Sequence, residues 1–144
     1  MAHPVNWFQI SGKDPGEGKA LQSFYKKIFG WKMSPSPDGS PMAMIAPEKG
    51  GIAGGVGASP SGQASIAIYA SCDDIDKHLK QIEGAGGRVA TAKMELPHGM
   101  GFIAGFLDPS NNLVGLWQAG KPAPKKRAAA KKPAKKPAKK KSKR

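Results

Sequence analysis

The sequence contains a single cysteine, Cys72, which excludes an intramolecular disulfide. It has no apolar run close to the ~20 residues that a membrane-spanning helix needs, so no membrane span is expected. Its first residues, from Met1 to Asn6, lack the basic and apolar regions of a secretory signal peptide. Together these absences predict a protein of the reducing cytoplasm.

Acidic residues are absent from the last 24 positions, and this absence divides the chain into two parts. Of the 23 lysines and arginines, 13 lie from Lys121 to Arg144, where there is no Asp or Glu. Residues 1–120 therefore hold 10 basic and 10 acidic residues and carry no formal net charge. We interpret residues 1–120 as one folded domain and residues 121–144 as a polycationic tail.

The tail is expected to be disordered, because it contains no apolar side chain larger than alanine and its like charges repel. It resembles the lysine-, alanine- and proline-rich tails of linker histones and bacterial histone-like proteins. We expect it to bind nucleic acid without sequence preference, through phosphate neutralisation. The alternatives are another polyanion, or a merely solubilising role. The cations assigned to this contact are Lys125, Lys126, Arg127, Lys131, Lys132, Lys135, Lys136, Lys139, Lys140 and Lys141.

The first half of the domain reads as a strand, a helix and further short strands. Residues 5–10 are aromatic and β-branched, which favours a strand. Apolar residues at helical spacing over residues 20–29 predict a helix with one apolar face, which Gly30 ends. Extended segments are expected from Trp31 onward and over residues 42–46 and 51–57.

The second half repeats this order. Residues 65–70 predict a strand, with Ile66 and Ile68 packed on the helix that follows. Ser71 is expected to cap that helix, and glycines at 84, 86 and 87 to end it. Extended structure from residue 88 and a hairpin over 102–107 and 113–117 complete the unit. Because neither half can bury both faces of its sheet, we expect the halves to pack as one α+β domain.

These paired βαβββ units resemble the vicinal oxygen chelate superfamily, which includes glyoxalase I, extradiol dioxygenases and bleomycin-resistance proteins. The resemblance covers residues 5–118 and implies a curved sheet that forms a cup. It is carried in the first unit by Phe24-Tyr25 and Phe29-Gly30-Trp31, and in the second by Asp73-Asp74-Ile75-Asp76, Gly86-Gly87 and Asp108-Pro109 followed by Asn112-Leu113-Val114-Gly115-Leu116.

Metal enzymes of this superfamily place their ligands on four strands that face the cup. Carried over one by one, those positions fall on Trp7, on Gly54 or Gly55, on Ser65 and on Gly115. None offers the imidazole, thiolate or carboxylate that a divalent metal prefers. The resemblance therefore implies the fold without the usual metal site, and no cofactor is expected.

Strand alternation predicts which side chains line the cup. The expected ligand-binding residues are Trp7, Gln9, Ser65, Tyr69 and Trp117, a mainly aromatic set that suits a small planar or apolar organic ligand. The alternative is that these rings simply fill the cup or a dimer interface.

One further residue, His98 in Pro97-His98-Gly99-Met100-Gly101, is a candidate for acid–base catalysis, because it lies near the expected mouth of the cup and the glycines that follow it would let it move. The sequence thus supports three interpretations. The first is a metal-free binding module with a nucleic-acid-binding tail. The second is a glyoxalase-type lyase or isomerase, or a dioxygenase-like enzyme, with a nonstandard site. The third is a homodimeric scaffold that presents two polycationic tails.

Overall fold

A computed structural model describes residues 2–120, and each half of this region contributes four strands and one long helix. The expected tail lies outside the described residues. The first unit consists of β1 (Val5–Gly12), α1 (Pro15–Phe29), β2 (Met33–Pro35), β3 (Ala43–Ile45) and β4 (Ala53–Ala58). The second consists of β5 (Ser65–Cys72), α2 (Ile75–Gly84), β6 (Arg88–Glu95), a short 3₁₀ turn (Pro97–Gly99), β7 (Phe102–Leu107) and β8 (Leu113–Gln118).

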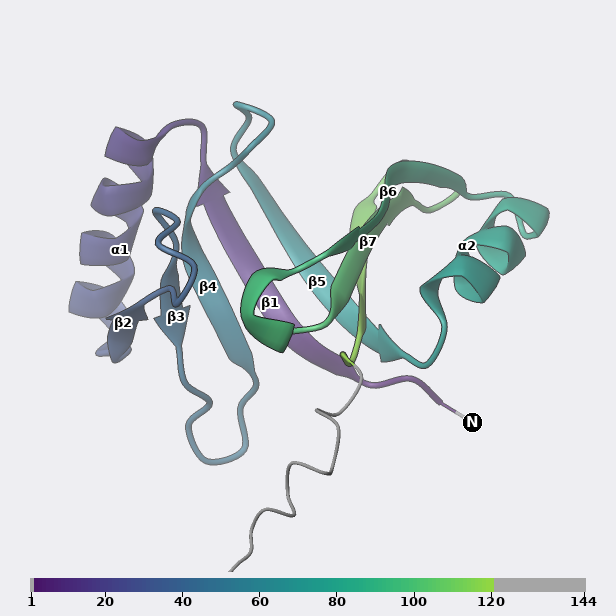
Figure 1. Ribbon diagram of the computed structural model, residues 1–144. Coiled ribbons are helices and arrows are strands. Elements are labelled where there is room, and N and C mark those ends of the chain that lie inside the picture. Colours follow the sequence, from purple (N-terminus) through teal and green to yellow (C-terminus); the bar gives the residue numbers. More distant parts are fainter. Residues whose placement is uncertain (1, 121–144) are drawn as a thin grey trace, which may run out of the picture.

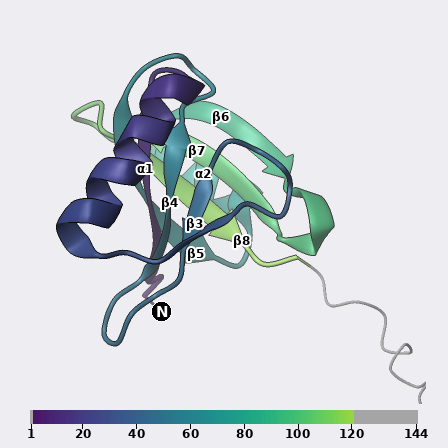
Figure 2. The ribbon, with the colours of Figure 1, turned by 90° about the vertical axis from the view of Figure 1, so that its left-hand side faces the viewer.

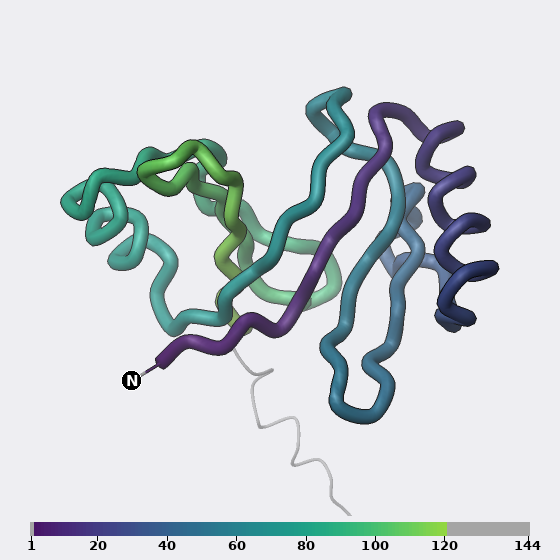
Figure 3. The backbone as a smooth tube through the Cα atoms, turned by 180° about the vertical axis from the view of Figure 1, so that it is seen from behind, coloured from purple at the N-terminus to yellow at the C-terminus, as the bar shows by residue number. Residues whose placement is uncertain are grey.

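The eight strands form one mixed sheet in the order β2-β3-β4-β1-β5-β8-β7-β6. The two units join where β1 and β5 pair antiparallel, and Figure 3 shows these strands side by side through the middle of the molecule. The sheet is strongly curved, with α1 and α2 at opposite flanks (Figure 1). This confirms the predicted α+β class with paired units. Over residues 2–120, neither helix is long and apolar enough to cross a membrane.

Helix α1 ends at Gly30 as predicted, but it begins at Pro15, ahead of the apolar pattern over residues 20–29 that predicted it. The Asp14 side chain accepts a hydrogen bond from the Glu17 N–H at 2.8 Å, and Gly30 ends the helix in the left-handed conformation. The helix lies across β4 (Figure 2), and a Cβ atom on Gly18 would come within 2.7 Å of the Gly57 backbone. Small residues are therefore required where helix and strand cross.

The apolar face predicted for α1 is only partly buried. Leu21 and Tyr25 are half-buried, whereas Phe24, Ile28 and Phe29 are 54%, 55% and 58% exposed. The helix contacts β4 and, to a lesser extent, β1, and within residues 2–120 no other strand covers the far side of its apolar face.

The N-terminus of α2 differs from the expectation. Asp74 caps the helix by accepting a hydrogen bond from the Lys77 N–H at 3.1 Å, so the prediction of Ser71 as the cap was wrong. Ser71 instead belongs to β5, because pairing with β8 continues to Cys72 opposite Gln118. The ladder hydrogen bonds of two more residues therefore prevail over the capping preference of serine.

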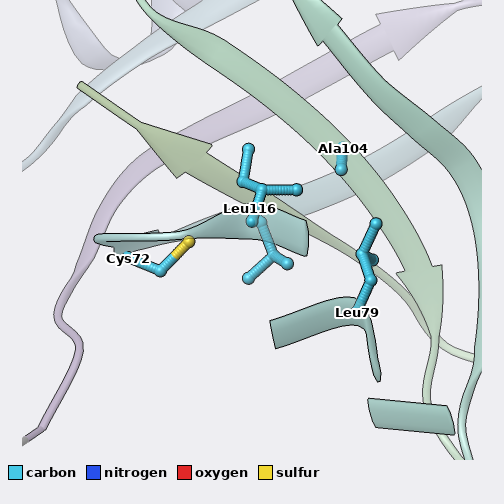
Figure 4. Close-up of a cluster of buried hydrophobic side chains, with 5 residues drawn as sticks. Cys72, Leu79, Ala104 and Leu116 are labelled. Carbon is cyan, nitrogen blue, oxygen red and sulfur yellow. The ribbon is translucent and has the colours of Figure 1, made fainter. Parts of the chain in front are cut away.

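A cluster of buried side chains lies between α2 and the sheet (Figure 4). It unites Ile75 and Leu79 of the helix with Ala104 and Leu116 of the strands, and with Cys72. Burial, more than the acidic neighbours, raises the pKa of the Cys72 thiol. The single cysteine is therefore a core residue held in its thiol form.

The prediction that Ile66 and Ile68 pack on α2 was also wrong, since their side chains are 68% and 44% exposed. Helix α2 packs over β6, β7 and β8, and α1 over β4 and β1. The convex side of β5 therefore has no helix above it among the described residues. This leaves an uncovered apolar strip in the middle of the sheet.

The contact between Phe8 and Gly54 yields a stability prediction. A Cβ atom on Gly54 would overlap the Phe8 ring, so Gly54→Ala should destabilise the domain by roughly 1–3 kcal/mol through overpacking. The matched control is Gly84→Ala at the end of α2, where a Cβ meets open space and should be neutral or slightly stabilising. Thermal unfolding of both variants checks this, and equal melting temperatures would contradict the packing described here.

Candidate ligand-binding pocket

The curved sheet encloses a pocket of about 390 Å³ on its concave side, built from both units. Aromatic, thioether and aliphatic side chains form most of its wall, with a few polar groups among them. The lining residues are Asn6, Trp7, Gln9, Ser36, Asp38, Ser40, Met42, Met44, Tyr69, Leu96, Met100, Ile103 and Trp117.

Four of the five residues predicted to line the cup lie in this wall: Trp7, Gln9, Tyr69 and Trp117. Both indoles are held in place by hydrogen bonds. Trp7 Nε1 donates to Gln9 Oε1 at 3.3 Å, and Trp117 Nε1 donates to the Met100 carbonyl at 2.9 Å. Two large ring surfaces are thus fixed before any ligand arrives, which lowers the entropy that binding must offset.

The ring of Tyr69 lies directly on the backbone of Gly115, the residue that faces it across the β5–β8 ladder. A Cβ atom on Gly115 would overlap that ring. Burial raises the pKa of the Tyr69 phenol above its ordinary value of 10.0. The hydroxyl therefore stays protonated at neutral pH and can both donate and accept a hydrogen bond.

The other two candidate residues lie outside the wall. Ser65 pairs with Ser11 at the far end of β5, four positions from Tyr69, and is not among the lining residues. His98 is exposed on the 3₁₀ turn with φ of 58°, while the pocket wall takes Leu96 and Met100 from either side of it. The structure therefore does not bring these two residues together with the aromatic group.

Asn6 is a lining residue that strand alternation did not predict, because alternation assigns it to the opposite face from Trp7. The β1–β5 register shifts between Val5 and Trp7, so Asn6 is the extra residue of a β-bulge. Bulges re-aim side chains, and this one brings Asn6 to the pocket. Its Oδ1 atom is buried and accepts no hydrogen bond, the only such side-chain atom found within residues 2–120.

A loop between β2 and β3 adds the only charged group of the wall. Asp38 Oδ1 accepts hydrogen bonds from Ser36 Oγ at 2.6 Å and from the Ser40 N–H at 2.9 Å. The Ser36 bond, supported by Ser40, lowers the pKa of Asp38 from 3.8 to about 2. The carboxylate is therefore ionised at every pH at which the domain would normally be studied.

The remaining lining residues were also missed, although part of the signal was present. Met42 and Met44 alternate with Ala43 and Ile45, which are buried, so a period of two along this strand would have assigned both methionines to the cup. Leu96, Met100 and Ile103 come from the β6–β7 region, where register shifts between Val89 and Met94 disturb the alternation.

The residues at the implied metal positions do not fit a divalent ion. Gly55 rather than Gly54 faces the cup, since a Cβ atom on Gly55 would lie 3.1 Å from Trp7 Cζ2. The backbone of Gly115 is covered by the ring of Tyr69. Within residues 2–120 no three His, Cys, Asp or Glu side chains converge. The indole of Trp7, the hydroxyl of Ser65 and the bare backbone of the two glycines cannot replace imidazole and carboxylate ligands.

Comparison with known proteins gives one family for this region. A model of the Glyoxalase/Bleomycin resistance protein/Dioxygenase superfamily matches residues 6–116. A putative glyoxylase, CFP32, of Mycobacterium bovis is 27% identical over 130 residues, which cover 81% of this chain and 46% of that protein. The anthracycline biosynthesis protein DnrV of Streptomyces peucetius is 28% identical over 131 residues, covering 79% and 46%. The chain thus spans about half the length of these relatives.

Solved structures share the fold at low sequence identity. Methylmalonyl-CoA epimerase of Mycobacterium tuberculosis superposes with a TM-score of 0.57 at 17% identity, covering 87% of this chain and 91% of that one. A hypothetical protein, BH1468, of Bacillus halodurans reaches 0.59 at 15% identity, covering 85% and 99%. At these identities the likeness establishes the architecture alone.

The hydrogen bonds to Asp38 yield a titration prediction. Ser36→Ala removes the strongest of them, so the pKa of Asp38 should rise from about 2 toward 3.8. A lowered carboxylate pKa stabilises the folded state above pH 3.8, and this stabilisation is lost as pH falls toward 2. NMR titration of the Asp38 Cγ signal measures the shift. Ser34→Ala on β2 is the control and should leave the pKa unchanged; an unshifted pKa in Ser36→Ala would contradict the loop geometry.

Proposed function

The chain belongs to the glyoxalase/bleomycin resistance protein/dioxygenase superfamily, and from that premise we propose that residues 1–120 bind a small organic molecule without recruiting a divalent metal. The observation that carries this proposal is the pair of fixed indoles, Trp7 and Trp117, on either side of Tyr69 in a pocket of about 390 Å³. This volume falls in the range of small-ligand sites. A planar or apolar ligand would cover the rings and displace water from them.

Catalysis is the alternative that the names of the relatives raise, since they include a putative glyoxylase and an epimerase. The titratable side chains in the wall are Asp38 and Tyr69. A carboxyl with a pKa of about 2 is a weak base, and a phenol with a raised pKa is a weak acid. His98 lies outside the wall. These observations favour binding over proton transfer as the task of the pocket.

The second part of the proposal assigns nucleic-acid binding to residues 121–144. What supports it is composition alone: 13 cations and no anion follow a domain without net charge. Flexible lysines contact phosphates rather than base edges, so no sequence preference is expected. The folded domain contributes no comparable cationic excess.

Association of two copies is the third part of the proposal. Ile66 and Ile68 form an uncovered apolar strip on the convex side of the sheet, and exposed apolar surface of this kind is typical of contacts between chains. A homodimer that covers this strip would also present two tails, which raises the effective concentration of cations at one nucleic acid.

Blocking the pocket tests ligand binding. Ile103→Trp places a third indole inside the pocket, so the affinity for the neutral planar probe 1-naphthylmethanol should fall at least tenfold, or about 1.4 kcal/mol. Equilibrium dialysis of the full chain measures the affinity. The matched control is Ile28→Trp on the exposed side of α1, outside the pocket, which should bind as the unchanged protein does. Equal affinities for both variants would show that the probe binds elsewhere.

Salt dependence tests the tail. If about half of its 13 cations contact duplex DNA, log affinity should fall with log salt at a slope near −6. A chain ending at residue 120 should lose DNA binding and keep its melting temperature. A full-length control with glutamine at all 13 basic positions separates charge from length. Tight binding by the truncated chain would overturn the assignment.

A further inference from the structure

The charge of the pocket has one sign. Among the lining residues that the structure describes, Asp38 alone is charged at neutral pH, and none is Lys, Arg or His. The bonds from Ser36 Oγ and the Ser40 N–H both reach Oδ1, and the Asp38 side chain is exposed at the edge of the pocket. The carboxylate is thus held by its loop and is accessible to a ligand.

A second acceptor lies in the same wall. The β-bulge brings Asn6 to the pocket, where its buried Oδ1 accepts no hydrogen bond. A buried acceptor without a partner costs free energy. Because this oxygen is inaccessible in the structure, a ligand N–H group reaches it only if the Asn6 side chain turns toward the pocket, and Asp38 is the acceptor that a ligand meets directly.

The apolar part of the wall also favours positive charge. The faces of Trp7, Trp117 and Tyr69 carry the negative side of their ring quadrupoles, which attract ammonium groups. Met42, Met44 and Met100 supply polarizable thioethers that pack against an apolar body without adding charge. Rings and carboxylate thus act in the same direction.

The described residues next to the pocket add no net positive charge that would cancel the negative charge of Asp38. A neighbouring hollow shares Gln9, Ser40 and Met42 with the pocket and adds one cation, Lys13. Its Nζ atom lies 3.8 Å from Glu17 Oε1, so its charge is offset locally. The hollow also carries Asp14, which adds a second carboxylate on this side.

Building on the ligand-binding function proposed above, we propose that the ligand is an organic cation: an aromatic or otherwise apolar amine. Its ammonium group lies at Asp38 and its apolar body lies against Trp7 and Trp117. Anionic ligands of the same shape are disfavoured, because the wall, as far as residues 2–120 form it, offers them a carboxylate and ring faces and no Lys, Arg or His side chain. Asp38 thus selects the charge of the ligand, and the indoles select its shape.

Three probes with the same ring system test this inference on the full chain: 1-naphthylmethylammonium, 1-naphthylmethanol and 1-naphthoate. Equilibrium dialysis at neutral pH and low salt gives a dissociation constant for each. The cation should bind roughly tenfold more tightly than the alcohol, and the carboxylate more weakly than either. Asp38→Asn should bring the ratio of cation to alcohol affinity close to one. Asp73→Asn removes the same charge from an exposed position outside the pocket and should keep the wild-type ratio.

The outcomes separate the two proposals. If the alcohol binds but the cation gains nothing over it, or if Asp38→Asn keeps the full preference, the cationic ligand class is wrong and the binding function stands. If no probe of the three binds, the binding function fails and this inference fails with it. A preference lost equally in Asp38→Asn and Asp73→Asn reflects net charge rather than the pocket, and this too overturns the inference.

Discussion

The ring of Tyr69 lies on the bare backbone of Gly115, and this contact determines what the pocket can hold. The strand register places Trp7 opposite Tyr69, and Tyr69 opposite Gly115. Three neighbouring strands therefore present an indole, a phenol and no side chain at one level of the cup. At this level the resemblance implies metal ligands at the positions of Trp7 and Gly115, but not at Tyr69. Here aromatic packing occupies this level, which supports the proposal that the cup recognises its ligand by surface and charge.

On the convex side of the sheet, the two helices leave part of the surface uncovered. Helix α1 crosses β4 closely at Gly18 and Gly57, and α2 covers the strands at the other end. Between them Ile66 and Ile68 remain exposed. The same sheet thus forms a partly open aromatic pocket on one side and an exposed apolar strip on the other. The proposed ligand would occupy the first, and the proposed second copy of the chain would cover the second.

Much of this architecture follows from local sequence rules. Periodicity, the Gly30 stop and the repeated order of elements predicted the fold, and alternation assigned Trp7, Gln9, Tyr69 and Trp117 to one face. The failures arise where tertiary pairing prevails over local preference. Asn6 enters the pocket through a bulge that only the β1–β5 register reveals. Ser71 lost its predicted role as a cap because β8 extends the pairing of β5. Asp38 belongs to a loop, whose position no periodic pattern specifies.

Direct titration with a paramagnetic ion tests the central claim that aromatic packing has replaced the metal site. The full chain, labelled with ¹⁵N, is titrated with Mn²⁺ while the indole signals of Trp7 and Trp117 and the amide of Gly115 are followed. Because the donor set lacks imidazole and converging carboxylates, these signals should keep their intensity at one equivalent of the ion. Selective broadening of the two indole signals and the Gly115 amide signal at one equivalent of Mn²⁺, reversed by an excess of a chelator such as EDTA, would locate a metal in the cup. That result would contradict the account.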